Sequence, residues 1–198
     1  MKKLLVFVFV LSFITSCKKD SSNNKDQFPF YFSATINGAA VKYEANDLNS
    51  QYECGISSPY SASGEEHDIY EGTLIQDGND PSRNNIYVHI LKYFDHYPSD
   101  PERFAMLTID NYGYGSSDVS TSTVNGASIR YTDGNGKEWD SELGSQIGSS
   151  FSITELVDNP DDTSNKIFKA SFSCKLYDGN GGTIQVTNAV IRGKVFIP

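Results

Sequence analysis

Basic residues are scarce in this chain of 198 residues: 16 Lys and Arg stand against 25 Asp and Glu, which gives a net charge of −9. Proteins that bind nucleic acid need a basic surface to displace the counterions of the phosphates, so the composition argues against a nucleic-acid partner. It argues equally against electrostatic attraction to anionic lipid head groups. Such an acidic charge keeps an exported protein soluble, and this explains the composition without any further function.

Groups that commonly perform catalysis or bind metals are also few. The histidines are His67, His89 and His96, and the spacing of His89 and His96 matches no metal-ligand motif. His67 lies in the acidic stretch 65–68, which is either a weak metal site or a solvated loop. There is no Gly-x-Ser-x-Gly elbow, and no pair of carboxylates marks a glycosidase. We therefore expect a protein without a catalytic role.

No apolar run near the N-terminus is long enough to span a bilayer. Leu4–Ile14 covers 11 residues, follows the basic start Met1-Lys2-Lys3 and ends at Thr15-Ser16-Cys17. This pattern is typical of a secretory signal, and small residues directly before a Cys look like a bacterial lipobox. We expect cleavage after residue 16 and acylation of Cys17, for example with palmitate. The protein is then lipid-anchored in the cell envelope, at the outer membrane, with the face of the membrane left open.

A polar segment follows the expected anchor. Residues 18–27 contain no apolar side chain, so they cannot join a hydrophobic core. We expect three regions: a lipoprotein signal peptide at 1–16, a flexible tether at 17–27 and a β-sandwich domain at 28–198. The last region has about 170 residues, which is enough for one domain with its own core.

The folded region has the composition and periodicity of an all-β protein. It is rich in aromatic residues and glycine, with 12 Tyr, 12 Phe and 16 Gly in the whole chain, and no segment has apolar residues at helical spacing. Alternating apolar residues predict strands near 30–36, 41–45, 52–57, 68–76, 85–93, 104–110, 127–132, 149–157, 166–177 and 183–197. Residues 137–144 are a candidate for a short helical turn. We expect a single antiparallel β-sandwich of about nine or ten strands with little or no helix, and a closed barrel stays open as the alternative.

Turn residues fix two of the hairpins. Asn37-Gly38 directly follows the first strand, and the run 178–182 (Asp-Gly-Asn-Gly-Gly) joins two long strands. In the final segment the alternation changes phase, because the apolar residues of 183–186 and of 191–197 have opposite parity. This indicates either a β-bulge near 187–189 or two strands with a bend between them.

Two cysteines remain after Cys17. Period-2 alternation turns Cys54 towards the interior with Tyr52 and Ile56, and turns Cys174 inward with its neighbours in 168–176. Two inward thiols in an oxidising compartment are candidates for a disulfide between Cys54 and Cys174, worth about 4–5 kcal/mol in the chain-entropy model. The alternative is two buried, reduced thiols that act as small apolar groups.

Loops rich in Asp and Asn are candidates for calcium binding. The oxygen-bearing residues in question are Asp77, Asn79 and Asp80, then Asp133, Asn135 and Glu138, and finally Asp178 with Asn180. None of these loops follows the EF-hand pattern, and hairpin turns require the same residue types without any metal. We therefore expect no cofactor, with calcium as the open alternative.

Three aromatic residues lie in polar stretches. Tyr112 and Tyr114 belong to the sequence Asn-Tyr-Gly-Tyr-Gly, and Trp139 lies in 136–141. Exposed aromatic rings stack on sugars, so these residues are candidates for a ligand-binding surface. The alternative is that each packs into the core or anchors a loop.

Three motifs together carry a family resemblance: Phe32–Gly38 (FSATING), Phe151–Leu156 (FSITEL) and the stretch 168–194. Their order resembles that of an uncharacterised family of small lipoproteins from Bacteroidota-type bacteria, with an N-terminal ATING hairpin and a C-terminal VTNG-like hairpin. The chain departs from this pattern at Ala39–Val41, where the family has an aromatic residue, and at Asn188-Ala189 instead of a second Asn-Gly. The resemblance implies an exported β-sandwich and transfers no active site.

These observations predict a lipid-anchored envelope lipoprotein that acts as a binding or accessory module for a glycan or a protein. A glycan-directed hydrolase is the enzymatic alternative, and it requires two carboxylates about 5–10 Å apart in a cleft. The third alternative is an assembly partner that pairs through a sheet edge, for which the final strand, 183–197, is the first candidate.

Overall fold

The computed structural model describes residues 30–45, 52–57, 66–76, 80, 82–94, 96, 98–99, 101–102, 105, 107–115, 126–160 and 165–196. In 52–57 and 66–76 the description covers the backbone and the side chain of Ile75. The signal peptide 1–16, the acylation site Cys17 and the tether 17–27 lie outside the described residues and stay predictions.

The described part of the chain holds eleven strands. They are β1 Phe30–Ile36, β2 Ala39–Ala45, β3 Tyr52–Ser57, β4 Glu66–Gln76, β5 Asn85–Phe94, β6 Asn111–Tyr114, β7 Gly126–Thr132, β8 Glu138–Asp140, β9 Ser150–Asp158, β10 Asn165–Tyr177 and β11 Thr183–Phe196. A 3₁₀ turn, η1 (Ser141–Leu143), directly follows β8. The all-β class predicted from the alternating pattern is confirmed.

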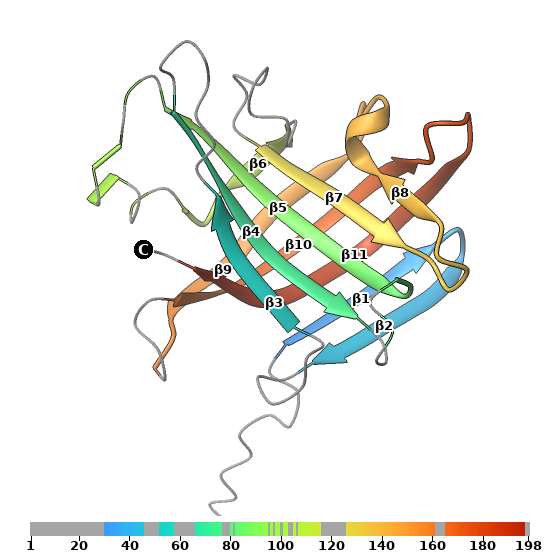
Figure 1. Ribbon diagram of the computed structural model, residues 1–198, viewed down its shortest axis with the longest axis horizontal. Coiled ribbons are helices and arrows are strands. Elements are labelled where there is room, and N and C mark those ends of the chain that lie inside the picture. Colours follow the sequence, from blue (N-terminus) through green and yellow to red (C-terminus); the bar gives the residue numbers. More distant parts are fainter. Residues whose placement is uncertain are drawn as a thin grey trace, which may run out of the picture.

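The strands form one continuous sheet in the order β2-β1-β11-β10-β9-β6-β7-β5-β4-β3, with β8 beside β10 and β7. The sheet folds over into a sandwich-like arrangement of two layers. In Figure 1, β7, β5, β4 and β3 lie in front of β9, β10, β11, β1 and β2, and the strands of the two layers cross at a steep angle. Among the described residues, β2 and β3 end this order and do not pair with each other, so they form the two edges of the sheet.

Two short strands turn the corner between the layers. β6 pairs antiparallel with β9 and parallel with the start of β7. β8 pairs with the end of β7 and, at Tyr177, with the end of β10. The β6–β7 pair is the exception to the antiparallel arrangement that the sequence predicts. Gly126 fits this corner because a Cβ on it would lie 2.6 Å from the carbonyl oxygen of Gly113.

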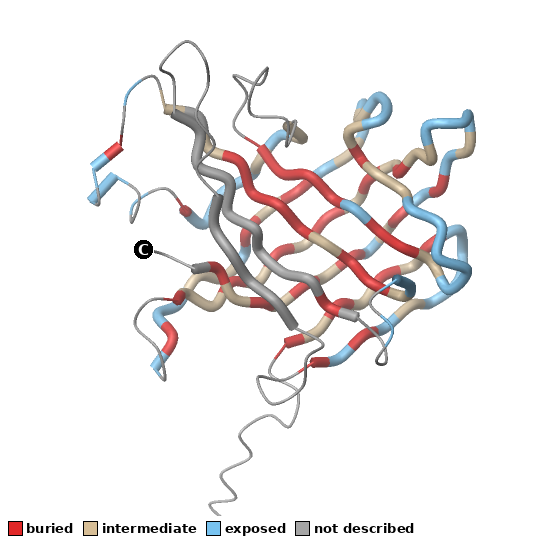
Figure 2. The backbone as a smooth tube through the Cα atoms, in the orientation of Figure 1, coloured by how far each residue is buried: buried red, intermediate tan, exposed pale blue. Residues whose placement is uncertain are grey.

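The core lies between the layers, and it follows the period-2 pattern of the sequence. Along β1 the residues Phe30, Phe32, Ala34 and Ile36 are buried, and those between them are half-buried. Figure 2 shows a similar alternation along β10 and β11 of the same layer, whereas β7 in the front layer is buried along almost its whole length. Phe172 stacks on Phe32 and on Phe151, with ring centroids 6.2 and 5.7 Å apart. Burying each such side chain contributes about 1.5–3 kcal/mol.

Both predicted hairpins and the predicted β-bulge are confirmed. Asn37 and Gly38 adopt φ angles of 47° and 82°, as the two-residue turn between β1 and β2 requires. β11 is one strand, and its pairing with β1 shifts between Thr187 and Val190, so that Asn188 and Ala189 form the bulge. The alternative of two separate strands with a bend is therefore wrong.

The short helical turn expected in 137–144 is confirmed as η1, which directly follows β8. Two details of the prediction fail. Residues 107–110, expected to be in a strand, lie in a loop that precedes β6. The final strand is not an edge of the sheet: β11 lies between β1 and β10. Among the described strands, the open edges of the sheet are therefore β2 and β3.

A candidate binding surface on β1, β2 and β11

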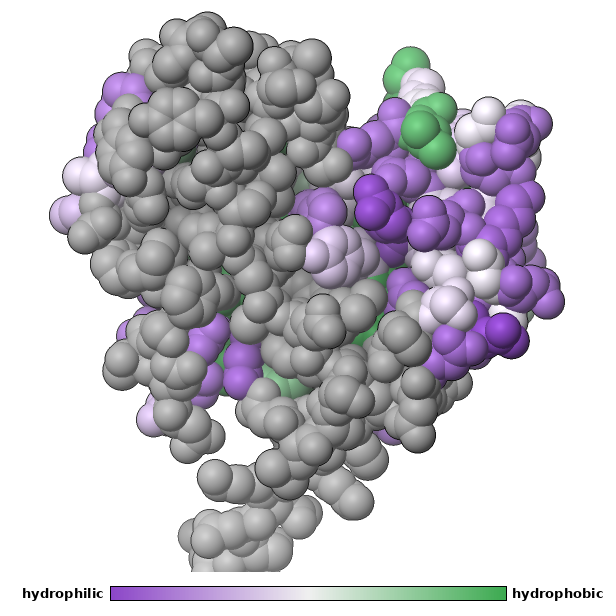
Figure 3. Space-filling model, viewed as in Figure 1, coloured by the Kyte–Doolittle hydropathy of each residue, from purple (hydrophilic) through white to green (hydrophobic). Residues whose placement is uncertain are grey.

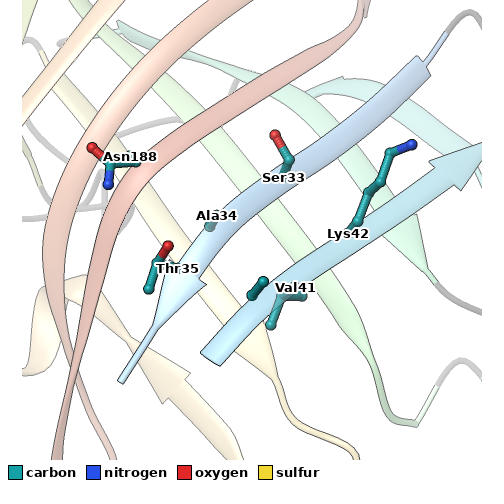
Figure 4. A pocket seen from close by; sticks show the side chains of 7 residues that line it. Ser33, Ala34, Thr35, Val41, Lys42 and Asn188 are labelled. Carbon is teal, nitrogen blue, oxygen red and sulfur yellow. The ribbon is translucent and has the colours of Figure 1, made fainter. Parts of the chain in front are cut away.

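A shallow hollow lies on the outer face of the sheet, where β1 runs between β2 and β11. Its volume is about 380 Å³. The lining residues are Ser33, Ala34 and Thr35 from β1, Ala40, Val41 and Lys42 from β2, and Asn188 from β11. Figure 4 shows Ser33, Thr35 and Lys42 on the same side of the sheet, with Asn188 across from them on β11. The hollow thus lies where β1 and β2, the first strands of the described chain, are next to β11, its last strand.

The bulge in β11 creates one wall of this hollow. Two residues of β11, Asn188 and Ala189, lie opposite the single residue Ala34, because Ser33 pairs with Val190 and Thr35 with Thr187. Asn188 has a φ of 52°, in the left-handed region that Asn tolerates better than most residues. The extra residue therefore lets Ala189 remain buried while Asn188 is exposed on the outer face.

The chemistry of the hollow is that of hydrogen bonding. It presents the hydroxyls of Ser33 and Thr35, the amide of Asn188 and the ammonium of Lys42, and its remaining lining is aliphatic. Lys42 forms an exposed ion pair with Glu44, also on the outer face of β2. Among the described residues that line the hollow there is no carboxylate, thiol or histidine. The groups that they present are hydrogen-bond donors and acceptors, which suit the binding of a polar ligand.

The three aromatic residues proposed for ligand binding are packed elsewhere. The ring of Tyr112 and the ring of Tyr114 both meet Phe151 edge to face, at centroid distances of 6.2 and 6.5 Å. The Tyr114 hydroxyl donates to the carbonyl of Ser173 at 3.1 Å, and burial raises the pKa of this hydroxyl. Both tyrosines thus complete the core at the β6 corner, the alternative that the sequence left open.

Trp139 anchors a loop. Its Nε1–H donates to Oδ2 of Asp133 at 3.2 Å, and the ammonium of Lys137 lies 4.2 Å from the centroid of its ring. Because Trp139 pairs with Tyr131 whereas Tyr114 pairs with Ala127, the two aromatic groups lie at opposite ends of one edge of β7. The structure therefore does not bring the three predicted residues together on one surface.

The carboxylates proposed for calcium are occupied by N–H and O–H donors of the protein. Asp178 accepts from the backbone N–H of Asn180 and of Gly182, at 2.9 and 2.7 Å, and from the ammonium of Lys137. The Lys137 contact and these backbone donors lower the pKa of Asp178 to about 2. Asp80 is held in the same way by Ser82 and Arg83.

Asp133 has the same arrangement in the neighbouring turn. Partial burial alone raises the pKa of its carboxyl, but the N–H groups of Lys137 and Asn135, the indole of Trp139 and the Lys137 charge together lower it. Within the described residues, no three His, Cys, Asp or Glu side chains are grouped to hold a metal. The observed contacts therefore explain these acidic loops as turns, and Asp77 and Asn79 lie outside the described residues.

One cluster contains the residue types of a hydrolase triad without its geometry. Glu102 accepts from the hydroxyl of Ser99 at 2.7 Å and lies 3.1 Å from Nε2 of His96. In a triad the serine donates to the histidine, whereas Ser99 donates to the acid. The Ser99 hydroxyl and backbone N–H and the His96 contact lower the pKa of Glu102 to about 2, so it is a poor general acid or base near neutral pH. The cluster is an exposed loop contact.

Cys174 is a free thiol in the structure and is fully buried. Burial raises its pKa to about 12. These observations fit the alternative of a reduced thiol that acts as a small apolar group. The side chain of Cys54 lies outside the described residues, so the disulfide between the two stays a prediction.

No family model, no curated protein and no solved structure matches this chain. In the part of the chain that the structure describes, no helix is long and apolar enough to cross a membrane. The hollow on β1, β2 and β11 was not predicted from the sequence, although the phase change that produces its bulge was. The missing information was the pairing of the first strand with the last, which no local pattern encodes.

Proposed function

We propose that this chain is a lipid-anchored cell-envelope protein, held at the outer membrane by acylated Cys17. The sequence of basic start, short apolar segment and small residues before Cys17 supports this location. The polar stretch 18–27 separates the anchor from β1, which begins at Phe30. A tether of this length lets the sheet stand clear of the membrane surface and meet a partner.

Its role is that of a non-catalytic binding or accessory module, and the hollow on β1, β2 and β11 is its binding surface. The observation that carries this proposal is the set of hydroxyl, amide and ammonium groups around an aliphatic floor. A sugar is most often held by stacking on an aromatic ring, and the described lining residues include none. The lining therefore favours a segment of an envelope protein over a glycan as the ligand.

Site-specific photo-cross-linking in living cells tests the proposal. The cross-linking amino acid is placed at Asn188 in the full-length chain, and at the exposed Thr154 of β9 as the matched control. We expect an adduct with another envelope protein from Asn188 only, and its loss when Lys42 is replaced by Glu. Equal labelling at both positions contradicts a binding role for the hollow. Binding of the purified chain to a glycan array, lost in the same Lys42→Glu variant, assigns the surface to a glycan instead.

A further inference from the structure

β2 is an edge strand whose outer hydrogen-bonding side carries alternating charges. The two-residue turn at Asn37-Gly38 makes Ile36 and Ala39 the closing pair of the hairpin. The backbone N–H and C=O groups therefore point alternately towards β1 and towards the open edge, and those of Lys42 and Glu44 point to the edge. Within the described chain no strand pairs with this side of β2 (Figure 1).

We propose that two copies of this chain pair antiparallel through β2, with the two-fold axis at Tyr43. In this register Lys42 of one copy lies opposite Glu44 of the other, and the symmetry repeats the contact on the far side of the axis. Both residues direct their backbone groups to the open edge, so each Lys42–Glu44 pair is also a hydrogen-bonded pair. About four backbone hydrogen bonds join the two strands.

Charge selects this register from its neighbours. A two-fold axis at Lys42 places two ammonium groups opposite each other, and an axis at Glu44 places two carboxylates there. Like charges directly opposite in a ladder are destabilising, whereas opposite charges are favourable. Lys42 and Glu44 are 63% and 42% exposed in the single chain, so both are accessible to a second copy. Charged side chains on an edge strand discourage pairing with most other strands. The charges of β2 are complementary to those of a second, antiparallel copy of β2.

The faces of the sheet agree with the same register. Inward-facing positions of one copy lie opposite inward-facing positions of the other, Val41 opposite Ala45 and Tyr43 opposite Tyr43, so the buried sides of Tyr43 and Ala45 stay on the core face of both copies. Phe30, the first residue of β1, lies beside Ala45 and so two strand positions from the axis. The two Phe30 positions are therefore roughly 20 Å apart, given the rise and spacing of strands. Both tethers can reach one membrane.

Such an interface is small, and it belongs to the class of weak associations. Anchoring both copies to one membrane raises their effective concentration and compensates for the low affinity. The inference is separate from the proposed binding function, since the hollow opens on the outer face and the second copy occupies the edge. Lys42 lines the hollow, and in the proposed pair it lies opposite Glu44 of the other copy on the outer face of the sheet. The hollows of the two copies therefore lie on the same continuous face.

Charge reversal tests the register. Lys42→Glu and Glu44→Lys are each introduced into the full-length chain, and association is measured by energy transfer between donor-labelled and acceptor-labelled chains anchored in the same lipid vesicles. We expect the wild-type chain to dimerise and each single variant to associate about tenfold more weakly, because both symmetric contacts then join like charges. An equimolar mixture of the two variants is expected to form mixed dimers as strongly as the wild type, since every contact across the edge is again between opposite charges.

Lys166→Glu is the matched control, since it reverses the charge of Lys166 in its ion pair with Asp158, which joins β10 to β9 away from the β2 edge. It should leave association unchanged. Circular dichroism checks that each variant folds. If a charge-reversal variant does not fold, Lys42→Gln, which removes the charge without reversing it, is used in its place. The proposal is overturned if the wild type stays monomeric, or if mixing the two variants gives no mixed dimer. A monomeric chain whose edge captures another protein through a cross-linker at position 42 also overturns it.

Discussion

The ammonium of Lys137 lies 2.6 Å from Oδ2 of Asp178, and this contact joins two turns that are 41 residues apart in the chain. Lys137 belongs to the turn between β7 and β8, and Asp178 to the turn between β10 and β11. The Asp178 side chain is 7% exposed, and its other donors are backbone N–H groups of its own turn. Lys137 also lies over the ring of Trp139. The contact therefore fixes one end of the front layer to the back layer.

We expect Asp178→Asn to lower the Tm at neutral pH. The folded-state pKa of Asp178, about 2, is below its ordinary value of 3.8, so the ionised carboxylate stabilises the fold above pH 3.8. This contribution is lost as the pH falls through the folded pKa. The Tm difference between wild type and variant should therefore be constant above about pH 5 and shrink towards pH 2. Thermal melts followed by circular dichroism measure it.

Lys166→Met is the control for that experiment. Its partner Asp158 is 87% exposed, so the pair is screened by solvent and contributes little. A pH-independent difference for Asp178→Asn contradicts the assigned role of the carboxylate.

Phe151 is the residue at which the core and the β6 corner meet. It is 1% exposed, and its ring contacts Phe172, Tyr112 and Tyr114. We expect Phe151→Ala to reduce the free energy of unfolding by about 3–5 kcal/mol, measured by urea denaturation. Ile147, which is 84% exposed, is the apolar control, and its replacement by Ala should change stability by less than about 0.5 kcal/mol. Similar losses for both variants argue against the assigned core.

Asn188, in the bulge of β11, has a left-handed backbone conformation. Asn188→Gly should leave stability unchanged or raise it by a few tenths of a kcal/mol, because glycine adopts this φ without strain. Asn188→Val should destabilise the fold by about 1–2 kcal/mol, because a β-branched residue resists it. Thr183→Val on the same strand, where no left-handed φ is required, is the control. Chemical denaturation separates the three variants, and equal stability of the Gly and Val variants speaks against the bulge.

Cys174 should be inert in the folded protein. Its burial and a pKa of about 12 leave almost no thiolate near pH 8. In a Cys17→Ala, Cys54→Ala variant, a thiol reagent should react with less than a tenth of the protein when folded and with one equivalent after denaturation. In a Cys17→Ala chain that retains Cys54, the number of reactive thiols after denaturation without reductant separates the two alternatives. Two thiols react if Cys54 and Cys174 are both reduced, and none reacts if they form a disulfide.

Cys17→Ala should abolish membrane anchoring. We expect the variant to incorporate no labelled palmitate and to leave the membrane fraction, whereas Cys174→Ala keeps both properties. The measurement is metabolic labelling with fractionation of the cell envelope. Equal labelling of the two variants means that the anchor lies elsewhere.

The local elements of this fold were largely predictable, and their partners were not. Alternation of apolar residues located β1, β5, β10 and β11 to within a few residues, and the phase change in β11 located its bulge. The short strands β6 and β8 carry too few residues for a periodic signal, and each is defined only by strands far away in the sequence.

The candidate site was harder to predict because it depends on pairing between distant strands. The glycine and polar residues around Tyr112, Tyr114 and Trp139 made them candidates for an exposed surface, with core packing or loop anchoring as the alternative. The two tyrosines pack against Phe151 at the β6 corner, and Trp139 anchors the loop that holds Asp133. Ser33 and Asn188 gave no signal, because nothing in either neighbourhood reveals that β1 and β11 are adjacent. On the face seen in Figure 3 the described residues are mainly hydrophilic, with a small hydrophobic patch.

The pairing of β1 with β11 has a consequence for how the protein matures. β1 directs half of its backbone groups to a segment made more than 140 residues later. Until Arg192 has been synthesised, this edge of the β1–β2 hairpin is unpaired, and the back layer cannot assemble. A nascent chain of this topology therefore stays unfolded for a long time, which would suit the export that we propose.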